Sequence, residues 1–181
     1  MVGRLRVFVA VAPPDEVRQD IAAQLAGIRI PGRVVPPPNW HITLRFLDDI
    51  DAVTRDRYLA ELDGLDLGKR FKMTLAGLGA FPNHRKATVT WLGVSAGEVR
   101  LFQLAEVTDD AAAAIGLLPE ERPFAPHLTL SRVRPPENVT GLIESTDCEV
   151  TWRVDDIVVV KSVSIRGGVR YEPIERFVLA R

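Results

Sequence analysis

A four-residue pattern, His-x-Thr-Leu, occurs twice in this chain of 181 residues. The copies, His41-Ile42-Thr43-Leu44 and His127-Leu128-Thr129-Leu130, are separated by 127 − 41 = 86 residues. Prolines precede both copies, and each copy lies in a segment whose composition is typical of a β-strand. The repetition predicts a fold of two related halves, in which an approximate two-fold axis brings both copies to one cleft.

Strand geometry explains the spacing within each copy. Side chains two residues apart share one face of a strand, so the histidine and the threonine of a copy are neighbours. The aliphatic residues of the copy point to the opposite face and anchor the strand there. Two of the three histidines of the chain occur in this pattern, so coincidence is the weaker interpretation.

Two imidazoles with two hydroxyls suit the hydrolysis of a phosphodiester. Two histidines with pKa values near ~6.5 can provide one neutral and one protonated ring around neutral pH. The neutral ring can take a proton from water while the protonated ring gives one to the leaving oxygen. Threonine hydroxyls can hold the non-bridging oxygens and stabilise developing charge. We therefore expect His41 and His127 to be catalytic and Thr43 and Thr129 to bind phosphate, with a strained cyclic phosphate as a suitable substrate.

Short alternating segments are mixed with helical ones along the whole chain. Alternation and turn residues predict strands over 5–11, 40–47, 71–78, 88–94, 123–133, 149–154, 157–165 and 171–179. Helices are expected over 15–28, 51–62, 98–115 and 137–143, the third with Val99, Phe102 and Ala105 on its apolar side. Hairpins with short connections favour an α+β fold with mostly antiparallel pairing. No linker divides residues 1–181, so we expect one domain with two pseudo-symmetric lobes.

Composition and charge exclude several classes of protein. With 23 basic and 24 acidic residues the formal net charge is −1, whereas proteins that coat long duplexes carry a clear basic surplus. The single cysteine and the absence of zinc-ligand spacing predict a protein without disulfides or metal. No Gly-rich phosphate loop is present, so no nucleotide cofactor is expected.

Apolar runs in the sequence are short. The run from Val7 to Ala12 ends at Pro13-Pro14, which is short for a signal-peptide core. No stretch approaches the ~20 apolar residues of a membrane span. We expect a soluble, cytoplasmic monomer without a membrane partner.

At the two motifs the sequence resembles the two-histidine phosphoesterase superfamily and, within it, the RNA 2′,3′-cyclic phosphodiesterases, also called 2′-5′ RNA ligases. The resemblance covers nearly the whole chain, through segments 6–10, 40–47, 79–82, 91–94, 122–132 and 171–177. It implies a bilobal, pseudo-two-fold fold in which two curved, mostly antiparallel sheets face a central cleft and helices lie outside.

The resemblance also implies an activity. Members hydrolyse 2′,3′-cyclic phosphate ends of RNA to 2′-phosphate ends without metal, and some join 2′-5′ ends reversibly. The 3′ oxygen is then the leaving group, which His41 would protonate while His127 activates the water. RNA ends or small cyclic nucleotides are the expected partners. Two alternatives stay open: a relative that acts on a small nucleotide such as an ADP-ribose cyclic phosphate, and an RNA-end binding module without catalysis.

Two arginines are further candidates for phosphate binding. The arginine that follows the second motif in the family corresponds to Arg132. Strict alternation would place Arg132 on the apolar side of its strand, so contact with substrate requires a twist, a bulge or a strand-end position. Strict alternation would place Arg45 on the same face as His41 and Thr43, but the family resemblance gives it less support.

The remaining residues of interest are aromatic or lie in turns. Phe8 shares a side of its strand with Arg4 and Arg6, where it can stack on a base or simply pack under a helix. Asp48-Asp49 stands where members often have glycine, and we expect it to form a turn at the strand end. Trp91 and Trp152 are expected in the core. The basic loop at 84–86 is expected to be exposed to solvent.

Overall fold

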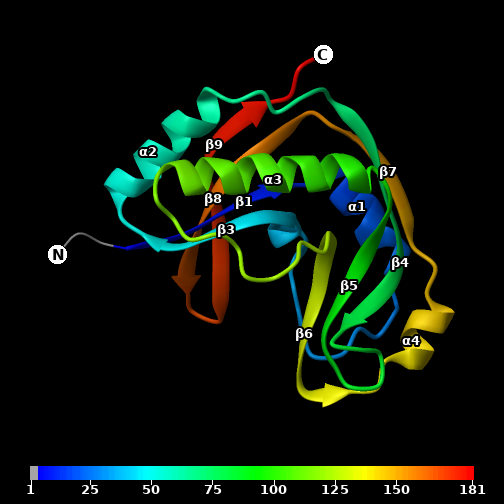
Figure 1. Ribbon diagram of the computed structural model, residues 1–181. Coiled ribbons are helices and arrows are strands. Elements are labelled where there is room, and N and C mark those ends of the chain that lie inside the picture. Colours follow the sequence, from blue (N-terminus) through cyan, green and yellow to red (C-terminus); the bar gives the residue numbers. More distant parts are fainter. Residues whose placement is uncertain (1–3) are drawn as a thin grey trace.

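The computed structural model describes residues 4–181. Its helices and strands follow one another along the chain (Figure 1) as β1 (Leu5–Val11), α1 (Asp15–Gln24), β2 (Arg33–Val34), the 3₁₀ helix η1 (Pro37–Asn39), β3 (Ile42–Ile50), α2 (Ala52–Asp63), β4 (Phe71–Phe81), β5 (Ala87–Ala96), α3 (Glu98–Ala114), β6 (His127–Glu137), α4 (Thr140–Ser145), β7 (Glu149–Val154), β8 (Asp156–Ile165) and β9 (Gly168–Val178).

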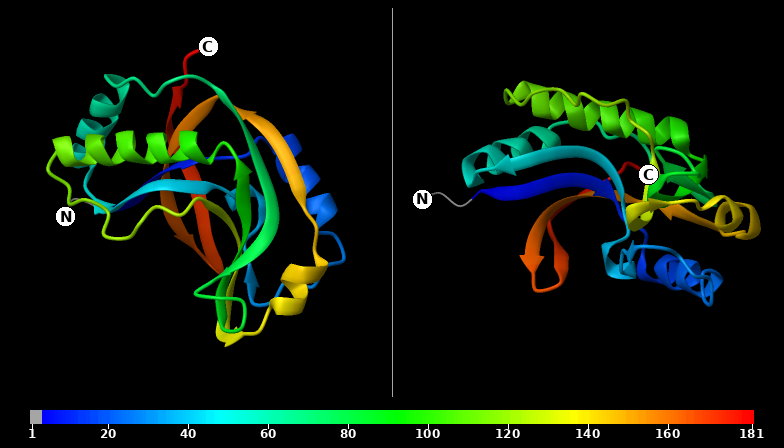
Figure 2. Two further views of the ribbon diagram at one scale, coloured as in Figure 1. Left: turned by 45° about the vertical axis from the view of Figure 1, so that its right-hand side comes forward. Right: turned by 90° about the horizontal axis from the view of Figure 1, so that it is seen from below.

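Within these residues the strands form one sheet in the order β7-β4-β5-β6-β3-β1-β8-β9, and β2 pairs with β6. Neighbouring strands are antiparallel. β3 and β6 are joined by a single residue pair, Ile42 with Leu128. The α+β class and the antiparallel pairing are therefore confirmed. The two expected sheets are two four-stranded halves of one curved sheet (Figure 2), and the halves meet at this pair.

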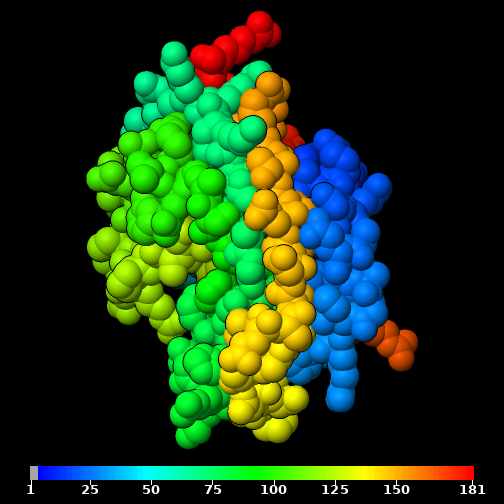
Figure 3. Space-filling view, turned by 90° about the vertical axis from the view of Figure 1, so that its right-hand side faces the viewer, coloured from blue at the N-terminus to red at the C-terminus, as the bar shows by residue number. Residues whose placement is uncertain are grey.

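Two helices, α1 and α3, connect the two halves. α1 follows β1 in the chain but packs against β7 of the other half, and α3 follows β5 but packs against β3. Figure 3 shows α1 beside β7 at the surface. One continuous core, which includes Ile21, Leu44, Leu104 and Leu130, consequently extends beneath both halves.

Local sequence sets where the helices begin and which side they bury. Asp51 caps α2, since its side chain accepts a hydrogen bond from the backbone N–H of Thr54 at 2.7 Å. The buried side of α3 contains Leu101, Leu104, Ala105, Thr108, Ala111 and Ala112. Ala105 is buried as expected, but Val99 and Phe102 are exposed, so the apolar side expected for this helix is wrong at these two residues. The apolar residues of α3 allow more than one buried side, and packing against β3 and α2 determines which side is buried.

Three further details of the fold differ from expectation. The proline segment before the first motif forms η1 rather than an extended approach, with the N–H of Trp40 donating to the carbonyl of Pro37 at 3.1 Å. β3 continues to Ile50, so the expected turn at Asp48-Asp49 lies inside the strand, where Asp48 has a φ of 55°. β6 begins at His127 rather than at Pro123. No helix in residues 4–181 is long and apolar enough to cross a membrane.

Candidate active site

Both histidines lie where the halves of the sheet meet. Ile42 and Leu128 face each other in an antiparallel pair. On β3, His41 and Thr43 lie on either side of Ile42. On β6, His127 and Thr129 lie on either side of Leu128, and His41 is therefore opposite Thr129. Diagonal neighbours on adjacent antiparallel strands lie roughly 7–8 Å apart. The side of the sheet that carries these four side chains, called the histidine face below, therefore brings the two histidines close to each other.

The two rings are held in the same way. His41 Nδ1 lies 2.7 Å from the carbonyl oxygen of Asn39, and His127 Nδ1 lies 2.6 Å from that of Ala125, in both cases two residues upstream. A carbonyl oxygen only accepts, so Nδ1 carries the proton in both rings and Nε2 is the acceptor when the ring is neutral. The hydroxyl of Thr43 donates to Nε2 of His41 at 3.0 Å. Each histidine is thus fixed in one tautomer.

Each imidazole also contacts two aromatic rings. The His41 ring lies 4.7 Å from that of Phe8 and 5.1 Å from that of Tyr171. The His127 ring lies 4.9 Å from that of Phe81 and 6.2 Å from that of Trp91. The expectation of a core position for Trp91 is wrong, since its ring is half-buried beside His127, whereas the buried Trp152 is a core residue as expected. Sequence reasoning missed Tyr171 and Phe81, although both lie in segments that carry the family resemblance.

Burial and positive charge lower the pKa of both histidines. The pKa of His41 falls to about 4, mainly because the ring is desolvated, and the positive charges of His127 and Arg132 lower it further. The pKa of His127 is also lowered, first by desolvation and then by Arg132. The backbone carbonyls that accept from Nδ1 oppose the shift in both rings. Both imidazoles are therefore mostly neutral at pH 7 in the free protein.

A β-bulge follows the threonine of each motif. Val9 and Ala10 of β1 pair with Arg45 and Thr43, so Leu44 is the extra residue of β3. Thr90 and Trp91 of β5 pair with Ser131 and Thr129 in the same manner, so Leu130 is the extra residue of β6. An extra residue shifts the later side chains of a strand to the opposite face. The two bulges therefore occupy equivalent positions in the two halves.

These bulges place the two candidate arginines on opposite faces. Arg132, the fifth residue after His127, is exposed on the histidine face and near enough to both rings to lower their pKa values. Arg45, the fourth residue after His41, points to the other face, is 6% exposed, and forms ion pairs with Asp109 at 2.7 Å and Glu120 at 2.9 Å. The parity argument that favoured Arg45 as a phosphate ligand is wrong because it assumed an unbroken strand.

Phe8 lies on the histidine face, as expected, but it is not available to a base. Its ring is 3% exposed and is covered by Tyr171, at a centroid distance of 5.0 Å, and by His41. Phe46 occupies the position of β3 that corresponds to Arg132 in β6 and is 41% exposed, 6.0 Å from Phe8. The expected role of Phe8 as a stacking surface is therefore not supported, and Phe46 is the accessible ring of this group.

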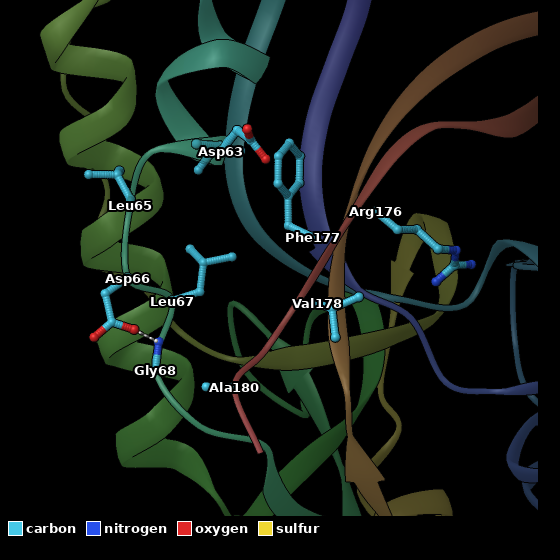
Figure 4. A pocket seen from close by; sticks show the side chains of 10 residues that line it. Asp63, Leu65, Asp66, Leu67, Gly68, Arg176, Phe177, Val178 and Ala180 are labelled. Carbon is cyan, nitrogen blue, oxygen red and sulfur yellow. Dashed lines mark hydrogen bonds between the residues drawn. The ribbon is translucent and has the colours of Figure 1, made fainter.

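Two hollows adjoin the sheet. One, of about 200 Å³, is lined by His41 together with residues of β1, α1, η1, β8 and β9. A larger one, of about 290 Å³, lies between the end of α2 and β9 (Figure 4) and contains neither motif. Its described lining includes Asp63, Asp66 and Arg176 but neither histidine, whereas the smaller hollow includes His41. The hollow beside His41 is the one that concerns the active site.

Two equivalent His-x-Thr motifs that meet at the junction of two sheet halves define a two-histidine phosphoesterase. The model of the family "LigT like Phosphoesterase" matches the chain twice, over residues 11–91 and 92–171, with one motif in each match. The chain belongs to this family, and the resemblance predicted from the motifs is confirmed.

Curated relatives and solved structures resemble most of the chain or nearly all of it. An RNA 2′,3′-cyclic phosphodiesterase of Escherichia coli is 33% identical over 178 residues, which cover 97% of each protein. One of Aeropyrum pernix is 31% identical over 153 residues, which cover 82% of this chain and 86% of the relative. The crystal structure of E. coli LigT with 3′-AMP superposes with a TM-score of 0.79 at 29% identity, covering 98% of this chain and 99% of that one.

Proposed function

We propose that this protein hydrolyses the 2′,3′-cyclic phosphate ends of RNA to 2′-phosphate ends, and that it does so without metal. The observation that carries this proposal is the pair of imidazoles fixed through Nδ1 on one face of the sheet, across the Ile42–Leu128 pair. Relatives that match 82% and 97% of the chain are named RNA 2′,3′-cyclic phosphodiesterases. Shared motif geometry and full-length similarity together support the assignment.

In the proposed reaction the cyclic phosphate lies between the two Nε2 atoms. The neutral ring takes a proton from water, whose oxygen attacks phosphorus in line with the P–O3′ bond. The protonated ring donates its proton to O3′ as that bond breaks, which leaves the phosphate on the 2′ oxygen. If a 5′ hydroxyl attacks in place of water, the same step gives a 2′-5′ linkage and the rings keep their roles. The rings exchange roles in the reverse step, in which the 3′ hydroxyl attacks phosphorus and the 5′ oxygen leaves.

The phosphate needs partners for its two non-bridging oxygens. Thr43 and Thr129 lie beside the histidines on the same face and supply hydroxyl donors. In the free protein the Thr43 hydroxyl bonds to Nε2 of His41, so bound phosphate would compete for this donor. Arg132 supplies positive charge from the same face. These roles extend the proposal from the histidine pair to the phosphate-binding groups.

The experiment that tests the proposal uses an oligonucleotide with a 2′,3′-cyclic phosphate end in the presence of a chelator. We expect a 2′-phosphate end, which resists a 3′-specific phosphatase and is released by a non-specific one. A 3′-phosphate product would refute the assignment of the leaving oxygen. Loss of activity with chelator, restored by added metal, would refute the metal-independent mechanism. An unchanged substrate that nevertheless binds tightly would favour the RNA-end binding module.

We also propose that the chain is one domain and acts as a monomer. The support for a single domain is the packing of α1 and α3, each of which covers the half that it does not follow. Chemical unfolding monitored through Trp40 and through Trp152, with the other tryptophans replaced by phenylalanine, should then give coincident transitions. Two separated transitions would show independent lobes. Light scattering would measure the mass in solution.

A further inference from the structure

The ring of Trp91 lies flat on a glycine of the neighbouring strand. Gly79 of β4 pairs with Trp91 of β5. A Cβ atom placed on Gly79 would come within 2.1, 2.3 and 2.5 Å of three consecutive carbon atoms of the indole, Cη2, Cζ2 and Cζ3. At distances this short, three consecutive ring atoms are nearly equidistant from one point only if that point lies over the face of the ring. One face of the indole therefore rests on Gly79, which is buried.

The glycine at this position makes room for the ring and is not required by the backbone. Glycine weakens the interior of a strand, and it often marks a place that another group approaches closely. Gly79 is not among the described glycines with positive φ, so other residues could adopt its backbone conformation. Their side chains would collide with the indole. The missing side chain thus lets the Trp91 ring lie against the sheet.

The opposite face of the indole is turned away from the core. Trp91 is half-buried and belongs to neither cluster of core residues. Two aromatic rings lie next to it, Phe81 at 5.2 Å and His127 at 6.2 Å between centroids. The indole Nε1 is inaccessible to solvent, so the ring offers a ligand its carbon surface. An aromatic face beside a catalytic imidazole is suited to stacking with a nucleobase.

The two motifs differ in this respect, although their strands are equivalent. Trp91 pairs with Thr129, and Ala10 pairs with Thr43. Ala10 is fully buried and lies with Phe8 in a separate small cluster. The surroundings of the two histidines are consequently asymmetric, with the indole on the side of the second motif. A phosphodiester is also asymmetric, since different groups lie on the two sides of phosphorus.

We propose that Trp91 stacks on the base of the nucleotide whose 5′ oxygen lies at His127. This role rests on the proposed function, with His41 acting on O3′ and His127 on the attacking oxygen. Attack on phosphorus is in line, so the terminal nucleotide, which carries O3′, extends toward His41. The entering or leaving 5′ oxygen lies toward His127, and its nucleotide extends to the side where Trp91 lies. Trp91 is then a specificity-determining residue for the second RNA end.

The reaction that involves this nucleotide is the formation and cleavage of a 2′-5′ linkage. In cleavage, the 3′ hydroxyl gives its proton to His41 and its oxygen bonds to phosphorus. The bond between phosphorus and the 5′ oxygen breaks, and His127 donates a proton to that oxygen. The products are a 2′,3′-cyclic phosphate and a free 5′ hydroxyl. Hydrolysis of the cyclic phosphate by water does not involve this nucleotide, so stacking on Trp91 favours only the first reaction.

The test compares two substrates that lose the same 5′ oxygen, one with a base on the leaving ribose and one without. They are adenylyl-(2′→5′)-adenosine and its counterpart in which the second ribose is abasic. In the unaltered protein we expect the second base to raise kcat/KM for cleavage about tenfold, as one base stacked on an aromatic side chain allows. Trp91→Leu should bring the ratio of the two kcat/KM values close to one. A disturbance of His127 changes both values alike and cancels in the ratio.

Three further variants separate stacking from a structural effect. Gly79→Ala keeps the indole but displaces it, and it should lower the ratio as Trp91→Leu does. Trp91→Phe keeps a smaller aromatic face and should retain part of the ratio. Phe102→Leu, at an exposed ring on α3, is the matched control and should leave the ratio unchanged.

Hydrolysis of a cyclic-phosphate oligonucleotide, measured alongside, separates this inference from the proposed function. If the oligonucleotide is not hydrolysed, the proposed function itself fails. If it is hydrolysed while the 2′-5′ compounds are not cleaved, or are cleaved with equal kcat/KM, the function stands and the stacking site is refuted. A high ratio that survives Trp91→Leu would overturn the assignment to Trp91, and its loss in Phe46→Leu would place the base on Phe46 instead.

Discussion

Ile42 of β3 lies directly opposite Leu128 of β6, and this pairing determines how the two histidines are placed. Both residues are fully buried, so they hold the two strands from the core side while the polar residues on either side of them face the other way. Ile42 and Leu128 occupy the same position in the two motifs, so an approximate local two-fold axis passes between them. Each histidine consequently lies diagonally across from the other, and each lies next to the threonine of the other half.

The first prediction concerns the imidazole pair. His41→Ala and His127→Ala should each lower kcat on a cyclic-phosphate oligonucleotide by about 10²–10⁴-fold, because one proton transfer is then lost. His84→Ala is the matched control, since His84 is an exposed loop residue, and it should retain full activity. Initial rates measured with variants of equal thermal stability would check this. Full activity of either active-site variant would end the catalytic assignment.

A second prediction concerns pH. The reaction needs one proton on the histidine pair. Burial lowers the pKa of both rings, that of His41 to about 4. A group with a lowered pKa loses its proton at lower pH, so the active form declines as pH rises through the pKa of His127. At pH values above the pKa of His127, we expect kcat/KM to fall about tenfold per pH unit.

Arg132 provides the matched variant for this pH profile. Its positive charge lowers the pKa of both rings, so Arg132→Gln should move the alkaline limb to higher pH, whereas Arg132→Lys should leave it nearly in place. The position of the limb, rather than the height of the profile, is the measurement, because loss of phosphate binding changes only the height. If the alkaline limb of the Arg132→Gln profile lay at lower pH than that of the unaltered protein, the electrostatic argument would be contradicted.

The third prediction identifies the acid. Replacing the bridging 3′ oxygen of the cyclic phosphate by sulfur creates a leaving group that needs no proton, since a thiol has a pKa of about 8.5. The variant that lacks the acid should then recover most of its lost rate, whereas the variant that lacks the base should not. The family resemblance implies His41 as the acid. Recovery by His127→Ala instead would reverse the two roles.

Arg45 and Arg132 should respond to substitution in opposite ways. Arg45→Gln removes a buried cation that pairs with Asp109 and Glu120, and we expect it to lower the free energy of unfolding by about 1–3 kcal/mol. Its kcat/KM at a temperature where the protein is folded should be nearly unchanged. Arg132→Gln should retain stability and lose activity. Urea titration and initial rates on both variants measure the contrast, and a loss of activity in Arg45→Gln without loss of stability would contradict it.

The fifth prediction concerns a strained aspartate. Asp48 has a φ of 55° inside β3, a left-handed conformation that glycine adopts without steric cost. Asp48→Gly should therefore raise the free energy of unfolding by roughly 0.5–1 kcal/mol. Asp49→Gly, at an exposed strand position without positive φ, should lower it. Equal destabilisation by both substitutions would show that the Asp48 side chain stabilises this bend.

Much of the site could be predicted from the chain alone. The alternation of side chains in a strand is a local property, so it determined that His41 and Thr43 share a face and that His127 and Thr129 do likewise. The prediction of a hairpin for β4 and β5 also depends only on neighbouring residues. The repetition of the motif indicated the two-fold arrangement before any tertiary contact was known.

The tertiary structure decided which further residues surround the histidines. A β-bulge belongs to two paired strands, so the extra residues Leu44 and Leu130 are apparent only once β1 and β5 lie beside the motifs. They turn Arg45 to the core side and Arg132 to the histidine face. Contacts between distant segments likewise bring Tyr171 over His41 and Trp91 beside His127. The sequence by itself determined the chemistry of the site, and long-range packing decided its surroundings, because side-chain alternation is local whereas strand register is set between strands.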